Sequence, residues 1–92
     1  MPINIYNKLN FESIDHLCDD VWDLPSLIDS LENWLKKTGR NLSEGSYVAD
    51  IGFDIRKDAS GGGGVINSES MSIMREIGMD VYLSEYPGTM KK

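Results

Sequence analysis

The segment from residue 47 to residue 86 carries the hydrophobic pattern that most constrains what this chain can fold into. Apolar and polar side chains alternate through Tyr47–Arg56, which is the pattern of a strand with one buried face and one wet face. A glycine run, Gly61–Gly64, follows, and a helical pattern then opens near Asn67. Alternation returns in Met79–Leu83, which predicts a closing strand. The segment therefore predicts a small sheet with a helix packed against it.

The most regular helical pattern lies in Leu24–Thr38. Its apolar residues recur at the i, i+3, i+4, i+7 spacing of a helix with one buried stripe: Leu24, Leu27, Ile28, Leu31, Trp34 and Leu35. Asp23 is placed to cap the start of the helix, and Pro25 lies in the first turn, where its missing N–H costs nothing. Gly39 follows the end. We therefore predict an amphipathic helix over this range.

Weaker patterns predict the remaining elements. Ile3 and Ile5 alternate with polar residues and indicate a short first strand. The segment Phe11–Trp22 has apolar residues at helical spacing and predicts a short helix. Gly64–Ile66 predicts a brief antiparallel strand. The helix that follows is predicted to end at Gly78. Its predicted buried side consists of Met71, Ile73, Met74 and Ile77.

Together these elements predict one domain, residues 1–92, of the α+β class. The expected order is β-α-α-β-β-α-β, in which a small antiparallel sheet carries its helices on one face. This is a ferredoxin-like or split βαβ variant with an extra short helix after the first strand. A chain of 92 residues can bury only one modest core.

Cellular location is predicted from what the sequence lacks. No apolar run approaches the roughly 18 residues that cross a bilayer. Residues 1–6 have neither the basic region nor the apolar stretch of a secretory signal. Cys18 is the only cysteine, so it cannot form an internal disulfide. We therefore expect a reduced, cytoplasmic protein that does not act at a membrane.

The acidic residues are distributed unevenly. The formal net charge is −6, and residues 1–34 hold seven acids against the single base Lys8, so this third of the chain accounts for the whole excess. The seven acids are Glu12, Asp15, Asp19, Asp20, Asp23, Asp29 and Glu32. Two interpretations are open: a solvated surface that maintains solubility, or a face that attracts a basic partner. The same charge argues against nucleic acid as a partner.

Side chains that carry chemistry are few. His16 is the only histidine and lies two residues from Cys18, so neither a zinc site nor a Cys–His nucleophile pair is indicated. Three aspartates share one face of the long strand at spacings too wide to chelate one ion: Asp50, Asp54 and Asp58. The glycine run matches no phosphate-binding pattern, and Val65 and Ile66 separate it from the helix start. We expect no cofactor, no metal and no enzymatic activity.

Residues 22–86 resemble a bacterial domain family of unknown function. The shared features are an amphipathic helix like Leu24–Thr38, a strand, a glycine-rich turn, a Leu/Met helix and a closing strand like Asp80-Val-Tyr82. The small size, the acidity and the lack of catalytic residues are also similar to those of bacterial toxin-immunity proteins, including those of contact-dependent growth inhibition systems. That resemblance implies inhibition of a toxin by binding, and it implies no particular site residues.

Three functional hypotheses follow. The leading one is an immunity protein that occludes the active site of a cognate toxin domain, with the seven acids facing a basic surface such as that of a nuclease. One alternative is a small-molecule sensor or regulatory module, with its ligand between sheet and helices near Gly61–Gly64. Another is a structural homo-oligomer that pairs through an exposed edge strand near Val65. These alternatives leave the oligomeric state open.

Overall fold

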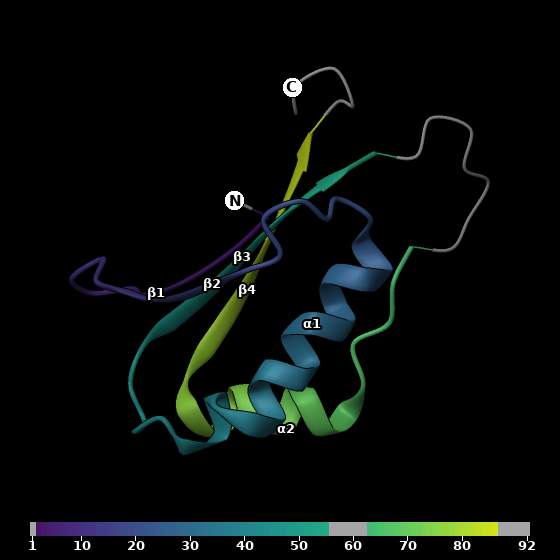
Figure 1. Ribbon diagram of the computed structural model, residues 1–92. Helices are drawn as coiled ribbons and strands as arrows, with labels where there is room; N and C mark the ends of the chain where they lie inside the picture. The colour runs from purple at the N-terminus through teal and green to yellow at the C-terminus, as the bar shows by residue number, and fades with distance from the viewer. Residues whose placement is uncertain (1, 56–62, 87–92) are drawn as a thin grey trace.

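The computed structural model describes residues 2–55 and 63–86, which form a four-stranded sheet and two helices (Figure 1). In chain order the elements are β1 (Ile3–Asn7), β2 (Ser13–Leu17), α1 (Leu24–Lys37), the 3-10 turn η1 (Gly39–Asn41), β3 (Tyr47–Asp54), α2 (Ser68–Ile77) and β4 (Met79–Tyr86). The α+β class predicted from the sequence is confirmed, with the element order β-β-α-β-α-β.

The sheet is mixed, with the strand order β2-β1-β3-β4. β1 pairs antiparallel with β2 and with β3, whereas β3 and β4 run parallel from the Tyr47–Met79 pair to the Asp54–Tyr86 pair. The prediction of a wholly antiparallel sheet is therefore wrong, and the predicted order β-α-α-β-β-α-β is not found. The physical reason is that α2 lies in the connection between β3 and β4 and returns the chain to the end where β3 began (Figure 1).

The predicted helix over Phe11–Trp22 is instead a turn, strand β2 and a loop. Phe11 and Cys18 have left-handed backbone angles, with φ of 61° and 62°, which a right-handed helix does not contain. The register of β2 against β1 skips Ile14, which is the extra residue of a bulge. Ile14 and Leu17 both pack against the core from this bulged strand, so their spacing of three mimics that of a helix.

No strand forms at Gly64–Ile66, contrary to the prediction. This segment runs past α1 on its way to α2, and a Cβ atom at Gly64 would overlap the side chain of Ile28. Asn67 then caps α2, because its side chain accepts a hydrogen bond from the N–H three residues on, at 2.8 Å. Gly64 is thus explained by close approach to α1. The first half of the glycine run Gly61–Gly64 lies outside the described residues.

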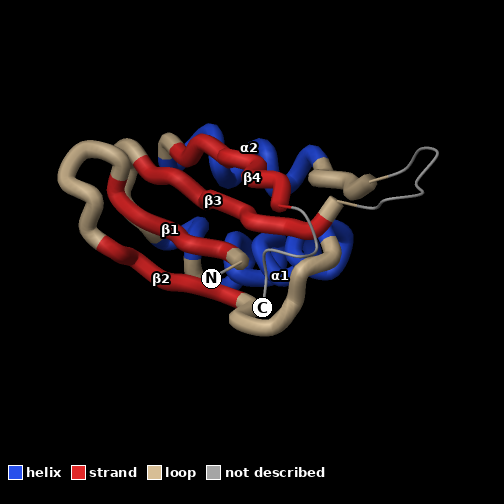
Figure 2. The backbone as a smooth tube through the Cα atoms, turned by 90° about the horizontal axis from the view of Figure 1, so that it is seen from above, coloured by secondary structure: helices blue, strands red, loops and turns tan. Residues whose placement is uncertain are grey.

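One hydrophobic core lies between the sheet and the two helices, which cover the same face (Figure 2). The fully buried apolar side chains of this core include Ile3, Ile5, Leu27, Leu35, Ala49 and Ile51. Each buried leucine or isoleucine contributes about 1.5–3 kcal/mol by leaving water. On α2 the buried positions are Ser70, Ile73, Met74 and Ile77. Met71 falls outside that stripe and is 53% exposed, so the prediction that it is buried is wrong.

The other face of the sheet carries no helix, but the prediction that it is largely wet holds only in part. Val48 is fully buried on it. The ring of Tyr86 lies across Gly52, where a Cβ atom would come within 2.8 Å of the ring. Trp22 meets the same ring edge-on, with the ring centroids 5.9 Å apart. The segment that precedes α1 therefore packs through Trp22 against Tyr86 at the end of the sheet.

Candidate functional site

A pocket of about 550 Å³ lies where the parallel strands β3 and β4 end. Its lining residues are Asp20, Trp22, Asp23, Leu24, Pro25, Phe53, Asp54, Ile55, Gly63 and Glu85. The carboxyl ends of parallel strands are a frequent place for binding sites, because the connections that leave the strands surround a common space. The volume is also within the range of small-ligand pockets, roughly 300–1,000 Å³. This pocket is the candidate functional site.

Two local interactions bring the segment between β2 and α1 over the strand ends. The backbone N–H of Asp54, the last residue of β3, donates to the carbonyl of Trp22 at 2.9 Å. One residue later, Asp23 caps α1 by accepting a hydrogen bond from the N–H of Ser26 at 3.1 Å. Residues 20–23 are thus held beside Asp54 by the strand on one side and by the helix on the other.

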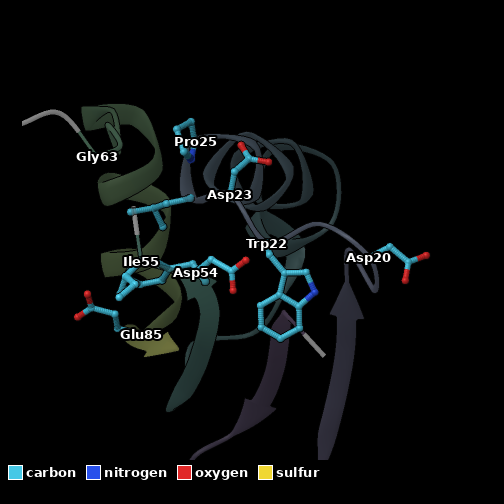
Figure 3. A pocket seen from close by; sticks show the side chains of 10 residues that line it. Asp20, Trp22, Asp23, Pro25, Asp54, Ile55, Gly63 and Glu85 are labelled. Carbon is cyan, nitrogen blue, oxygen red and sulfur yellow. The ribbon is translucent and has the colours of Figure 1, made fainter. Parts of the chain in front are cut away.

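The pocket combines apolar walls with an acidic rim. Trp22, Leu24, Pro25, Phe53 and Ile55 supply the apolar surface. The charged residues that line it are all acidic: Asp20, Asp23, Asp54 and Glu85. Asp20 and Glu85 lie on opposite sides of the opening, and the Asp54 carboxylate lies between Ile55 and Trp22 (Figure 3). Among the described residues no lysine, arginine or histidine lines this pocket, so its lining favours a cationic group attached to an apolar body.

The state of Asp23 is set by its capping role. Hydrogen bonds from the side chain and the backbone N–H of Ser26 hold the pKa of the Asp23 carboxyl below its ordinary value. Asp23 is therefore a carboxylate at neutral pH, and it contributes a fixed negative charge to the rim of the pocket.

The structure does not bring the seven predicted partner-binding acids onto one face. Glu12 lies in the turn between β1 and β2, at the opposite end of the sheet from the pocket. Asp15 accepts a hydrogen bond from the Nε1–H of Trp34 at 3.0 Å, so it serves the fold. Glu32 accepts one from the backbone N–H of Asn67 at 2.8 Å and holds the start of α2.

The other four of these acids lie nearer the pocket end. Asp20 and Asp23 line the pocket. Asp19 has an Oδ1 atom 3.7 Å from the Nε2 atom of His16 and is exposed. Asp29 is exposed on α1, about one turn after Pro25. Of the predicted set, therefore, Asp19, Asp20, Asp23 and Asp29 are the members that are placed near the pocket.

Sequence reasoning missed two residues of the site, Asp54 and Glu85. They are far from residues 20–23 along the chain and reach the pocket because β3 and β4 end side by side. The alternating pattern of the two strands predicted both strands. However, the antiparallel pairing that we expected would have placed the ends of β3 and β4 at opposite ends of the sheet. The parallel pairing is what unites them.

Other kinds of site have less support. Within residues 2–55 and 63–86, no group of three or more His, Cys, Asp or Glu side chains could hold a metal ion. None of the helices in the described part of the chain is long and apolar enough to cross a membrane. No protein family, curated protein or solved structure matches this chain.

Proposed function

We propose that this chain is a binding protein of the immunity type, which neutralises a cognate toxin domain by direct contact with a basic surface of that domain. In this proposal the contact is made at the acidic end. We define it as Asp20, Asp23 and Glu85, which line the pocket, together with the exposed Asp19 and Asp29 on the adjoining segment and helix. The chain acts by occlusion, without catalysis and without a cofactor.

The observation that carries the proposal is the convergence of carboxylates from segments distant in sequence. Asp20 and Asp23 precede α1 and Glu85 is near the end of β4, yet all three line one pocket. Like charges gathered at one end repel one another and therefore cost stability, unless a partner of opposite charge compensates for them. A toxin that acts on nucleic acid has a basic surface, and an acidic inhibitor competes for it.

Protection of growth tests the proposal. If the gene directly upstream encodes a toxin domain, cells that express that domain are expected to grow when this chain is co-expressed. Reversing two charges at the pocket, with Asp20→Lys and Glu85→Lys, is expected to abolish protection, because both positions are exposed and face the partner. The matched control is Glu12→Lys with Glu44→Lys, which changes the net charge equally at exposed positions outside the pocket.

The control variant is expected to protect as well as the wild type. If the pocket variant protected equally well while remaining folded, or if the wild-type chain gave no protection, the proposal would be wrong. Cooperative thermal unfolding of each purified variant establishes that loss of protection reflects the surface and not the fold.

The pocket itself favours a second candidate function, a sensor of small organic cations. Its volume of about 550 Å³ and its apolar walls suit a ligand that carries an amine or guanidine on a hydrophobic body. Thermal-shift screening against metabolite classes tests this: cationic ligands are expected to raise the unfolding temperature and anionic ones to leave it unchanged. No rise with any cation would eliminate this candidate.

A further inference from the structure

The outer edge of β4 is the least protected edge of the sheet. Within the described residues no strand pairs with it. β4 runs for eight residues in unbroken register with β3, and its sequence contains no lysine and no proline. Short length, lysine, proline and bulges are the devices by which proteins usually block pairing at an open edge. β4 has none of these four. Its one charged side chain on the helix-covered face is Glu85, which is opposite Phe53, next to the last residue of the strand, and is exposed.

The opposite edge, β2, is protected in three ways. It is five residues long and carries the bulge at Ile14. Asp15 is opposite Ile5, which belongs to the core, and its side chain is held by the Trp34 Nε1–H at 3.0 Å. A charge directed inward from an edge strand discourages the approach of another strand. The sheet can therefore be extended by β4 and not by β2.

Leu83, in the middle of β4, shows that an apolar surface continues beyond the core. It pairs with Ile51, which is fully buried, and so faces the same side of the sheet as the helices. The helices nevertheless leave Leu83 57% exposed. Val81, two residues before it on the same face, is only partly buried. This strip of apolar side chains lies beside the unpaired edge.

We propose that β4 pairs antiparallel with β4 of a second copy of this chain, about a two-fold axis at Leu83. In that register Leu83 meets its own copy, Tyr82 is opposite Ser84, and Val81 is opposite Glu85. Asp80 is opposite Tyr86, so no acid faces an acid directly, an arrangement that would be destabilising. The strand is thus complementary to itself.

A second copy fits this edge better than an unrelated strand, because pairing two β4 edges leaves no unprotected edge for a further chain. A two-fold contact uses the same edge on both chains and joins the two four-stranded sheets into one. Only the two protected β2 edges then remain, so the assembly stops at the dimer. Antiparallel pairing also directs the carboxyl ends of the two β4 strands in opposite directions, which leaves the two acidic pockets at opposite ends. The dimer proposal is argued from the β4 edge and not from the proposed function, although Glu85 belongs to both surfaces.

The salt dependence of association is a specific test of the dimer. Each chain carries a formal net charge of −6, so two copies repel one another and added salt is expected to strengthen their association. Light scattering at increasing concentration is expected to show a mass that rises from one chain of 10.3 kDa toward two, and to rise further at high salt. Leu83→Lys is expected to weaken dimerisation at least about tenfold, because two ammonium groups would be opposed.

The matched control is Leu9→Lys, since Leu9 is another exposed leucine, located in the β1–β2 turn. It is expected to dimerise as the wild type does. A wild-type chain that stays at the mass of one copy at high concentration and high salt would overturn the proposal. So would a folded Leu83→Lys variant that dimerises normally.

Cross-linking gives a second test that does not require a disruptive variant. In a Cys18→Ser background, Leu83→Cys is expected to form a disulfide between copies on mild oxidation, because directly opposed residues at the two-fold bring their Cβ atoms to about 4.5 Å, the upper end of the disulfide range. Leu9→Cys in the same background is expected to remain largely uncross-linked. Equal cross-linking at both positions, or none at residue 83, would contradict the register.

Discussion

Both ends of the sheet are held by backbone hydrogen bonds, but they differ in how their charged groups are paired. At the hairpin end, defined as the turns around residues 8–12, 43–46 and 78, backbone groups bond one another: the N–H of Lys8 donates to Ser46, that of Gly45 to Ile77 and that of Tyr47 to Gly78. Its pocket, of about 340 Å³, is lined by both signs of charge, from Lys8, Arg75 and Asp80. At the pocket end the charged lining residues that the structure describes are all acidic.

The difference between the two ends is one of charge pairing within the molecule. At the hairpin end, Lys8 and Asp80 form a salt bridge of 2.9 Å, so opposite charges neutralise one another within the molecule. At the pocket end Asp20 and Glu85 lie on opposite sides of an opening, and within residues 2–55 and 63–86 no base lines this pocket (Figure 3). A surface whose charge is not compensated within the described lining is the surface we expect a basic partner to contact.

The largest predicted effect is at the hairpin end. Gly78→Ala is expected to lower the free energy of unfolding by more than about 2 kcal/mol, because φ is +82° and the new Cβ would collide with the carbonyl oxygen of Gly45. Gly63→Ala at the pocket end is the control, since φ is also positive but nothing lies within 4 Å. We expect it to cost about 1 kcal/mol. Urea unfolding measures both, and equal losses would contradict the collision.

The sequence predicted correctly those elements whose signal lies in neighbouring residues. Local signals identified α1 from its apolar stripe, β3 from its alternation and the end of α2 at Gly78, which has the left-handed angle typical of such a cap. Each depends on neighbours along the chain, so the sequence contains the information. Whether β3 and β4 pair parallel depends on the path of the connection, which no local pattern encodes.

The site was predicted less well for the same reason. The acid-rich first third drew attention to Asp20 and Asp23, which the structure places in the lining of the pocket. Charge counting could not show that Asp15 and Glu32 are engaged by Trp34 and Asn67, because those contacts join positions 19 and 35 residues apart. The predicted helix at residues 11–22 failed because a bulged strand can reproduce helical spacing over a short stretch.

The next effect concerns one aromatic ring at each end. Trp22→Ala is expected to cost about 2 kcal/mol, because the half-buried indole forms a wall of the pocket and packs edge-on against Tyr86. Phe11→Ala is the matched change at the hairpin end. That ring is 76% exposed, so its loss is expected to lie within about 0.5 kcal/mol. If Phe11→Ala lowered the free energy of unfolding as much as Trp22→Ala, the two rings would contribute equally to stability, contrary to this expectation.

A smaller effect on stability is expected from acidic pH, through Asp23 at the pocket end. The pKa of Asp23 is lowered from 3.8, so its charge stabilises the fold above about pH 3.8, and this contribution is lost as the pH falls through the folded pKa. Asp23→Asn retains a capping side chain without the charge. The variant should be less stable than the wild type at pH 7 and equal to it in strong acid. A difference independent of pH would show that the charge has no role.

The smallest effect on stability is expected from alkaline pH, at the Lys8–Asp80 salt bridge of the hairpin end. The hydrogen bond and the negative charge of Asp80 raise the pKa of Lys8 above 10.5. The salt bridge therefore contributes fully below pH 10.5, and its contribution is lost as the pH rises through the raised pKa. The stability difference between the wild type and Lys8→Met should shrink in that alkaline range. Because the pair is exposed, the difference is expected to be near the limit of detection at neutral pH.

The most direct test of the central claim, that the pocket end receives a basic partner, is the association rate with the isolated toxin domain as a function of salt. The wild-type rate is expected to fall steeply as ionic strength rises. Asp20→Asn with Glu85→Gln is expected to associate about tenfold more slowly at low salt, whereas Glu12→Gln with Glu44→Gln should match the wild type. If the rate were indifferent to salt, or if both double variants slowed association equally, the pocket end would not be the contact surface.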